Sequence, residues 1–137
     1  MEGTRQKSLV LILARELAAN LATPMFLVDR DGTLVFYNEA ADAIVGQPFA
    51  QVGEMPVADW AALLKPEDAD GNRISRAAAA PGIAFLERRP AHQELYVTGA
   101  DGVRRRIAIT AYPLFSKADE FAGAIAIFWE DGHGGEP

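Results

Sequence analysis

The chain has 137 residues, of which 50% are hydrophobic and 23% are charged, and this is the size and composition of one globular domain. The sequence contains no cysteine, which excludes disulfides and thiol chemistry and fits a cytoplasmic location. The net charge of −6 disfavours binding to phosphate backbones or to anionic lipid. We therefore expect neither nucleic acid nor a membrane as a partner.

The first predicted element is a helix over residues 9–21, with Ser8 as its N-cap. The apolar run at its start is too short to span a bilayer, and no signal-peptide cleavage site follows it. One apolar stripe has helical spacing and is suited to packing on the domain. It comprises Val10, Leu13, Ala14, Leu17 and Leu21.

This helix carries more apolar surface than one stripe, because Leu9, Leu11 and Ile12 lie outside it. A second copy of the same helix is the simplest partner for the surplus, so we expect a homodimer. The expected interface residues are Leu9, Val10, Ile12, Leu13 and Leu17. The alternative is that another part of the same chain covers the surplus.

A β-hairpin is predicted next, because two short apolar runs at residues 25–28 and 34–37 flank an Asp-Arg-Asp-Gly turn at residues 29–32. Asn38 follows the second run and is a good N-cap for a short helix over residues 39–45. Glycine then ends that helix.

Prolines and glycines divide residues 47–76 and limit the length of any element there. We predict one short helix over residues 59–64 and another over residues 83–88, which a proline ends.

The hydrophobic period changes to two after residue 92, which is typical of strands. Residues 94–98 and 103–114 alternate around an Asp-Gly turn, and residues 122–129 are apolar on both faces, as in a central strand. The order of helix, two strands, short helices and three strands predicts an α+β fold. We expect an N-terminal helix over residues 1–21, one domain over residues 22–131 and a flexible tail over residues 132–137.

Three blocks follow one another with regular gaps. They are the hairpin and helix start of residues 25–41, the two strands of residues 94–114, and the sequence Gly-Ala-Ile-Ala-Ile-Phe-Trp-Glu-Asp at residues 123–131. Together they resemble the PAS family over residues 17–131. The resemblance implies a five-stranded antiparallel sheet in the order 2-1-5-4-3, with short helices that enclose a cavity over one face. It also implies a sensory role in signal transduction.

The residues that hold cofactors in some branches of that family do not match. The branches that form flavin or cinnamoyl adducts need a cysteine, and none is present. The haem-binding branch carries its axial histidine on the helix before the third strand, and residues 83–88 contain no histidine. His92 follows Pro90, and His133 lies in the glycine-rich tail, so haem is a poor match and two isolated histidines predict no metal site.

The usual PAS exit motif continues into a signalling helix, whereas here Asp131 is followed by Gly132 and the sequence soon stops. We therefore expect either a stand-alone PAS protein or one that signals through a separate effector protein.

If the helices enclose a cavity, its walls predict a small apolar ligand such as a fatty acid, an aromatic or a flat heterocycle. The candidate helical wall comprises Trp60, Leu64, Ile83, Phe85 and Leu86. The candidate sheet floor, which depends on the phase of the strands, comprises Leu95, Ile107, Ile109, Ile125 and Ile127. The alternative is a filled core made of the same residues.

Three functions remain open. The leading one is a sensory PAS module that binds a small apolar ligand, signals through homodimerisation, or does both. The second is a pure interaction domain with a filled core. The third is a small enzyme in which Asp59 beside Trp60 transfers protons. We expect no enzyme, because no nucleophile with a base, no paired carboxylates and no phosphate-binding loop occur.

Overall fold

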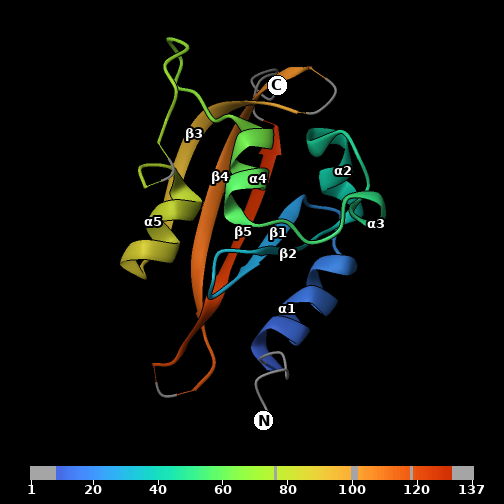
Figure 1. The fold of residues 1–137 in the computed structure, drawn as a ribbon, viewed down its shortest axis with the longest axis vertical. Helices are drawn as coiled ribbons and strands as arrows, with labels where there is room; N and C mark the ends of the chain where they lie inside the picture. Colours follow the sequence, from blue (N-terminus) through green and yellow to red (C-terminus); the bar gives the residue numbers. More distant parts are fainter. Residues whose placement is uncertain (1–8, 76, 100–101, 118, 131–137) are drawn as a thin grey trace, which may run out of the picture.

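The computed structural model describes residues 9–75, 77–99, 102–117 and 119–130, apart from the side chains of residues 43–44 and 61–64. Within these residues the chain forms one antiparallel sheet in the order β2-β1-β5-β4-β3, which confirms the predicted fold class (Figure 1). The strands are β1 (Met25–Asp29), β2 (Leu34–Tyr37), β3 (Ala91–Thr98), β4 (Arg104–Phe115) and β5 (Phe121–Glu130). The helices are α1 (Leu9–Ala19), α2 (Glu39–Val45), α3 (Phe49–Val52), α4 (Val57–Leu64) and α5 (Ala80–Glu87).

The sheet has a different cover on each face. On the inner face, one buried cluster joins the sheet to residues of α2 and α5, with Trp60 of α4 packed against it. On the outer face, a second cluster joins the sheet to Leu11 and Ala18 of α1. None of the described helices is long and apolar enough to cross a membrane.

The β1–β2 turn is built by Asp29. One oxygen of its carboxylate accepts hydrogen bonds from the backbone N–H groups of Asp31 at 2.9 Å and Thr33 at 3.1 Å. Gly32 has a φ of 86°, which a residue without Cβ adopts freely. The hairpin predicted from this segment is therefore present, with the aspartate side chain as its internal brace.

Strands β1 and β5 approach closely at Gly123, which pairs with Asp29. A Cβ at this position would collide with the carbonyl oxygen of Val28, and the φ of 148° also excludes most side chains. The close contact of the two central strands therefore depends on a glycine at this position.

Asn38 joins three parts of the chain. Its side-chain oxygen accepts hydrogen bonds from the backbone N–H of Met25 at 3.0 Å and of Ala41 at 3.2 Å, so it caps α2 as predicted and also ties the start of β1. Its amide nitrogen donates to the carbonyl oxygens of Ala18 and Thr23, both at 2.9 Å. The residue is only 2% exposed, so these bonds are made out of water.

The orientation of α1 corrects the sequence prediction. The face on the sheet contains Leu11 and Ala18, whereas Leu13 and Leu17, assigned to the packed stripe, are 58% and 55% exposed. Because the helix is apolar almost all round, spacing alone did not select a face. The small side chain of Ala18 allows the close approach that its bond to Asn38 requires.

Helices α3 and α5 differ from the sequence prediction, and α4 begins two residues earlier than predicted, at Val57. The short α3 was not predicted; it begins after Pro48 and ends at Gly53, within the segment where only short elements were expected. Helix α5 begins at Ala80 and not at residue 83, because Pro81 lies in its first turn, where a missing N–H costs nothing.

We expect Asn38→Ala to lower the free energy of unfolding by about 3 kcal/mol, because it strands several buried backbone groups without partners. Equilibrium unfolding in urea measures this change. Asn20→Ala is the matched control, since Asn20 is exposed and makes one hydrogen bond to the carbonyl of Glu16. That control should change stability by less than about 0.5 kcal/mol. Equal effects of the two variants would contradict the role assigned to Asn38.

Candidate ligand-binding cavity

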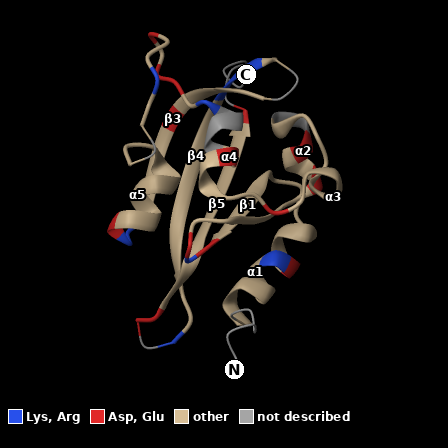
Figure 2. Cartoon of the chain, in the orientation of Figure 1, with Lys and Arg blue, Asp and Glu red and all other residues tan. Residues whose placement is uncertain are grey.

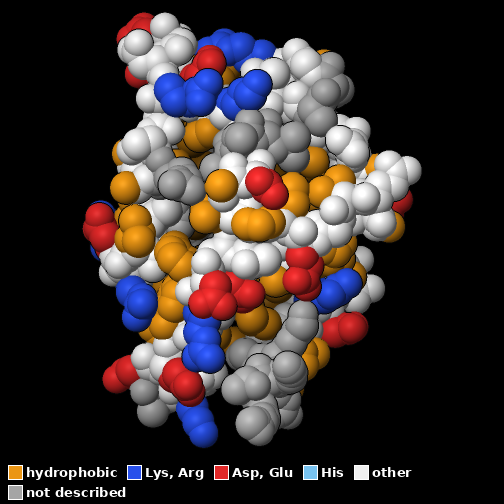
Figure 3. All heavy atoms as spheres, in the orientation of Figure 1, with side chains coloured by type: hydrophobic (Ala, Val, Ile, Leu, Met, Phe, Trp, Pro, Cys, Tyr) orange, Lys and Arg blue, Asp and Glu red, His pale blue; other side chains and the backbone are white. Residues whose placement is uncertain are grey.

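A cavity of about 840 Å³ lies between the inner face of the sheet, helices α4 and α5, and the segment of residues 66–79. We call it the central cavity. Its lining is mostly apolar, and Figure 3, which faces the helical side, shows hydrophobic side chains gathered over α4 and α5. A cavity of this size lies within the range of small-molecule sites, and its exposed lining residues open it to solvent on one side.

The floor of the cavity is formed by alternate residues of the strands. The structure places Leu95, Ile107 and Ile109 there, as the sequence analysis expected of these three. It places Ile125 and Ile127 on the opposite face, in the cluster with α1. The expectation for these two isoleucines was wrong. Because β5 is apolar on both faces, its sequence does not show which side chains face the cavity, and only its pairing with β1 and β4 decides this.

The helical wall contains Trp60, Phe85 and Leu86 of the expected set. Ile83 is half-buried on α5 and does not line the cavity. Leu64 belongs to α4, but its side chain lies outside the described part of the structure.

Trp60 is held in place from two sides. Its indole N–H donates to the carbonyl oxygen of Gly32 at 3.0 Å, which joins α4 to the β1–β2 turn. Its ring lies 5.4 Å from that of Phe26, which in turn meets Phe128 edge-on at 5.7 Å. The three rings form a continuous aromatic wall. Ring contacts of this geometry stabilise the fold beyond the effect of burying the apolar area alone.

Sequence reasoning missed part of the lining. Further apolar residues on the wall are Phe26, Val28, Val57, Ile74, Val97 and Phe128. The alternation of Phe26 and Val28 on β1 was a signal for one shared face, whereas the position of Ile74 in a loop gave none. The lining also includes three exposed residues with polar side chains, Asp31, Arg73 and Ser75.

The residues with displaced pKa values lie elsewhere. Burial, with the nearby Asp42 carboxylate, raises the pKa of Tyr37 to about 12, and its hydroxyl donates to the carbonyl of Gln47 at 2.5 Å. Partial burial, with Glu39 nearby, raises the pKa of Asp42. Hydrogen bonds from its own turn, foremost from Asn72, lower the pKa of Asp68. None of these three residues lines the central cavity.

The residues weighed as a haem ligand or as a proton-transfer group do not line the cavity in the described part of the structure either. His92 is exposed on β3, where its Nδ1 lies 2.7 Å from the Thr110 hydroxyl and its ring lies 6.4 Å from that of Trp129. His133 lies outside the described residues. Asp59 is exposed on α4 and does not line the cavity. Within the described residues, no three His, Asp or Glu side chains form a group that could hold a metal.

The comparison with known proteins decides the family. A model of the PAS fold matches residues 19–130, which is most of the chain. The chain belongs to the PAS fold family. PAS domains are in general sensory and regulatory modules rather than enzymes. No protein of curated function matches the sequence.

Several solved structures share this PAS fold. The LOV protein of Rhodobacter sphaeroides is 18% identical, with a TM-score of 0.69 over 89% of this chain and 67% of that one. A PAS domain from Colwellia psychrerythraea is 15% identical, with a TM-score of 0.64 over 89% and 97% of the two chains. The light-state dimer of the fungal blue-light photoreceptor Vivid is 17% identical, with a TM-score of 0.63 over 90% and 91%. At these identities the similarity establishes the fold.

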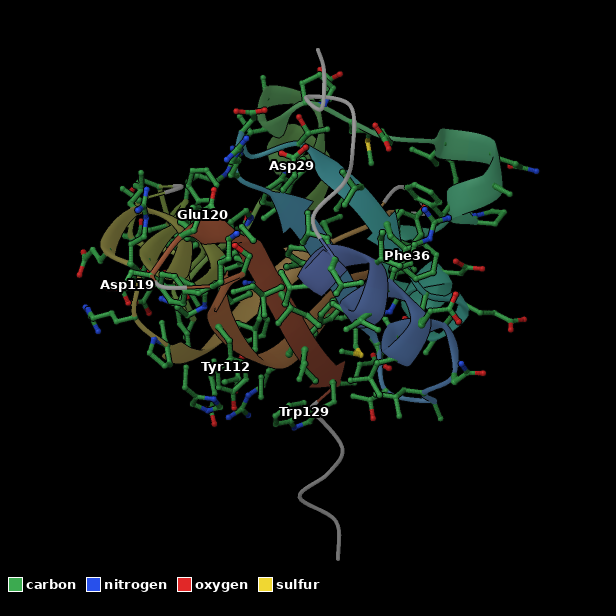
Figure 4. All side chains as sticks on the ribbon, turned by 90° about the horizontal axis from the view of Figure 1, so that it is seen from below. Asp29, Phe36, Tyr112, Asp119, Glu120 and Trp129 are labelled. Atoms are coloured by element: carbon green, nitrogen blue, oxygen red, sulfur yellow. The ribbon has the colours of Figure 1, made fainter. Side chains whose placement is uncertain are left out.

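We expect Trp60→Phe to lower the free energy of unfolding by about 1 kcal/mol, because the carbonyl of Gly32, a buried residue, loses its donor. Trp129→Phe is the control, since Trp129 lies on the outer face and is 41% exposed (Figure 4). Thermal or urea unfolding of both variants measures the difference. A loss confined to Trp129→Phe would contradict the bracing role of Trp60.

Proposed function

We propose that this PAS domain is a sensory module that binds a small apolar ligand in its central cavity. The observation that carries the proposal is the cavity of about 840 Å³ with an apolar lining. Ligand sites are concave and mostly apolar, with a few polar groups that fix orientation, and the central cavity has this composition. Because the sequence contains no cysteine, such a ligand is either bound non-covalently or attached through a group other than a thiol.

Native mass spectrometry of the purified protein tests the proposal directly. We expect additional mass that is lost on denaturation, which would also give the size of the ligand. In Ile109→Trp the larger side chain fills the floor of the cavity, so the additional mass should disappear while the protein stays folded by circular dichroism. Ile125→Trp is the matched control, because Ile125 lies on the opposite face of the same sheet.

A wild-type spectrum without additional mass, together with no binding of added apolar compounds, would refute ligand sensing. The domain would then be an interaction module, the second function that the sequence left open.

The output of the module is proposed to pass through a homodimer formed by α1. This helix presents an apolar surface to solvent, since Leu9, Ile12, Leu13 and Leu17 are all at least 45% exposed. An exposed patch of this kind is typical of an interface, and a two-fold axis brings the same residues of two copies together. Val10, also expected in the interface, is half-buried. The structurally similar Vivid is described as a light-state dimer.

We expect Leu13→Glu to convert the protein from dimer to monomer, because it places two like charges in the middle of an apolar interface. Sedimentation equilibrium measures the mass. Val103→Glu is the control, since Val103 is an apolar residue of similar exposure that lies outside α1, in the β3–β4 connection. An unchanged dimer in Leu13→Glu, or a monomeric wild type, would refute the role of α1.

A further inference from the structure

The polar residues of the central cavity belong to two different segments. Arg73 and Ser75 come from the segment that leads to α5, and Asp31 comes from the β1–β2 turn. All three residues are exposed, whereas the floor residues are buried, so the polar groups lie at the solvent side of the cavity. A molecule bound in the cavity would therefore place its apolar part against the sheet and a polar end near these groups.

The side chain of Arg73 differs from those of most other described arginines because it has no ion-pair or aromatic partner among the described residues. Arg104, Arg105 and Arg106 each face a carboxylate within 4.0 Å, and Arg89 does the same. Arg15 and Arg88 lie over aromatic rings. Within the described residues, only Arg30 and Arg73 lack both a carboxylate and a ring, and only Arg73 of these two lines the central cavity.

Two carboxylates of the same segment, those of Glu67 and Asp68, are already engaged. Glu67 pairs with Arg73 across a short antiparallel bridge, but its side chain is bound to Arg104 at 3.3 Å. Asp68 accepts hydrogen bonds from the backbone N–H groups of Asp70 and Asn72, both at 2.9 Å. No ion pair, hydrogen bond or ring contact engages the guanidinium of Arg73 within the described part of the chain, so its hydrogen-bond donors are available at the cavity.

The backbone around Arg73 is fixed by its neighbours. The N–H of Ile74 donates to the carbonyl of Pro66 at 2.9 Å, and the Ile74 side chain packs against the core. A ligand would bind an arginine whose backbone is already ordered. Binding would therefore cost less conformational entropy than it would on a mobile loop.

We infer that the ligand of the central cavity is an amphiphile with one carboxylate, whose carboxylate pairs with Arg73 and whose apolar body lies against the aromatic wall. This inference rests on the proposed sensing function and names the class of ligand. A guanidinium matches a carboxylate with two parallel hydrogen bonds. Asp31 on the same cavity and the net charge of −6 disfavour ligands with several negative charges. In Figure 2 several basic residues, drawn blue on the ribbon, lie near the end of the sheet where β3 leads into β4, with acidic residues, drawn red, close by.

The test compares two probes of equal chain length by isothermal titration calorimetry on the full chain, freed of copurified small molecules. Dodecanoate carries the carboxylate, and dodecan-1-ol lacks the charge; both are kept below the concentration at which they aggregate. Arg73→Gln should weaken dodecanoate binding about tenfold, the lower end for a hydrogen bond to a charged group because Arg73 is exposed to water. Binding of dodecan-1-ol should change by less than about twofold.

Arg30→Gln is the matched control, because it removes the same charge from an arginine that also has no side-chain partner among the described residues and does not line the central cavity. It should leave both affinities within about twofold, and higher salt should weaken dodecanoate alone in the wild type. Equal losses for both probes in Arg73→Gln, or no loss for either, would overturn the carboxylate inference while ligand sensing stands. A wild type that binds neither probe would overturn the inference, and native mass spectrometry without additional mass would then refute sensing as well.

Discussion

A buried side-chain amide needs partners for its two N–H groups and its oxygen, and Asn38 meets this need by joining α1, β1 and α2. The carbonyl oxygens that it binds belong to Ala18 and Thr23, at the end of α1 and in the connection to β1. The helix on the outer face and the helix that begins on the inner face are therefore held by one residue. This contact and the packing of Leu11 and Ala18 on the outer face together join the N-terminal helix to the PAS core.

The sheet separates the central cavity from α1, and β5 contributes side chains to the cavity on one face and to the contact with α1 on the other. Phe128 on this strand lines the cavity, whereas Ile125 and Ile127 pack in the cluster with α1. A ligand that displaced Phe128 would act on the same strand whose other face contacts α1. Only this one strand would thus separate a bound molecule from the helix of the proposed dimer interface. No separate linker would be needed to connect the two.

Much of the fold could be predicted from the sequence, because the hairpin, the Asn38 cap and the three C-terminal strands each carry local signals of turn, cap or period. The floor residues Leu95, Ile107 and Ile109 followed from clear alternation. Ile125 and Ile127 could not be assigned to a face from the sequence, since the one polar side chain of β5, that of Glu130, lies at its very end and does not set its phase. The face of α1 was misjudged for the same reason, and Arg73 was overlooked because a loop position has no period to reveal what it lines.

The position of Asn38 also sets the mechanics of α1. The helix is tied by its C-terminal end, whereas Leu9 at the other end is 68% exposed. An 11-residue helix is about 16 Å long, so a tilt about its fixed end displaces Leu9 much further than Leu17. Because Leu11, near that end, is buried against the outer face of the sheet, such a tilt would also shift its packing there, so a rearrangement at the start of β1 and a movement of the exposed end of α1 would accompany each other.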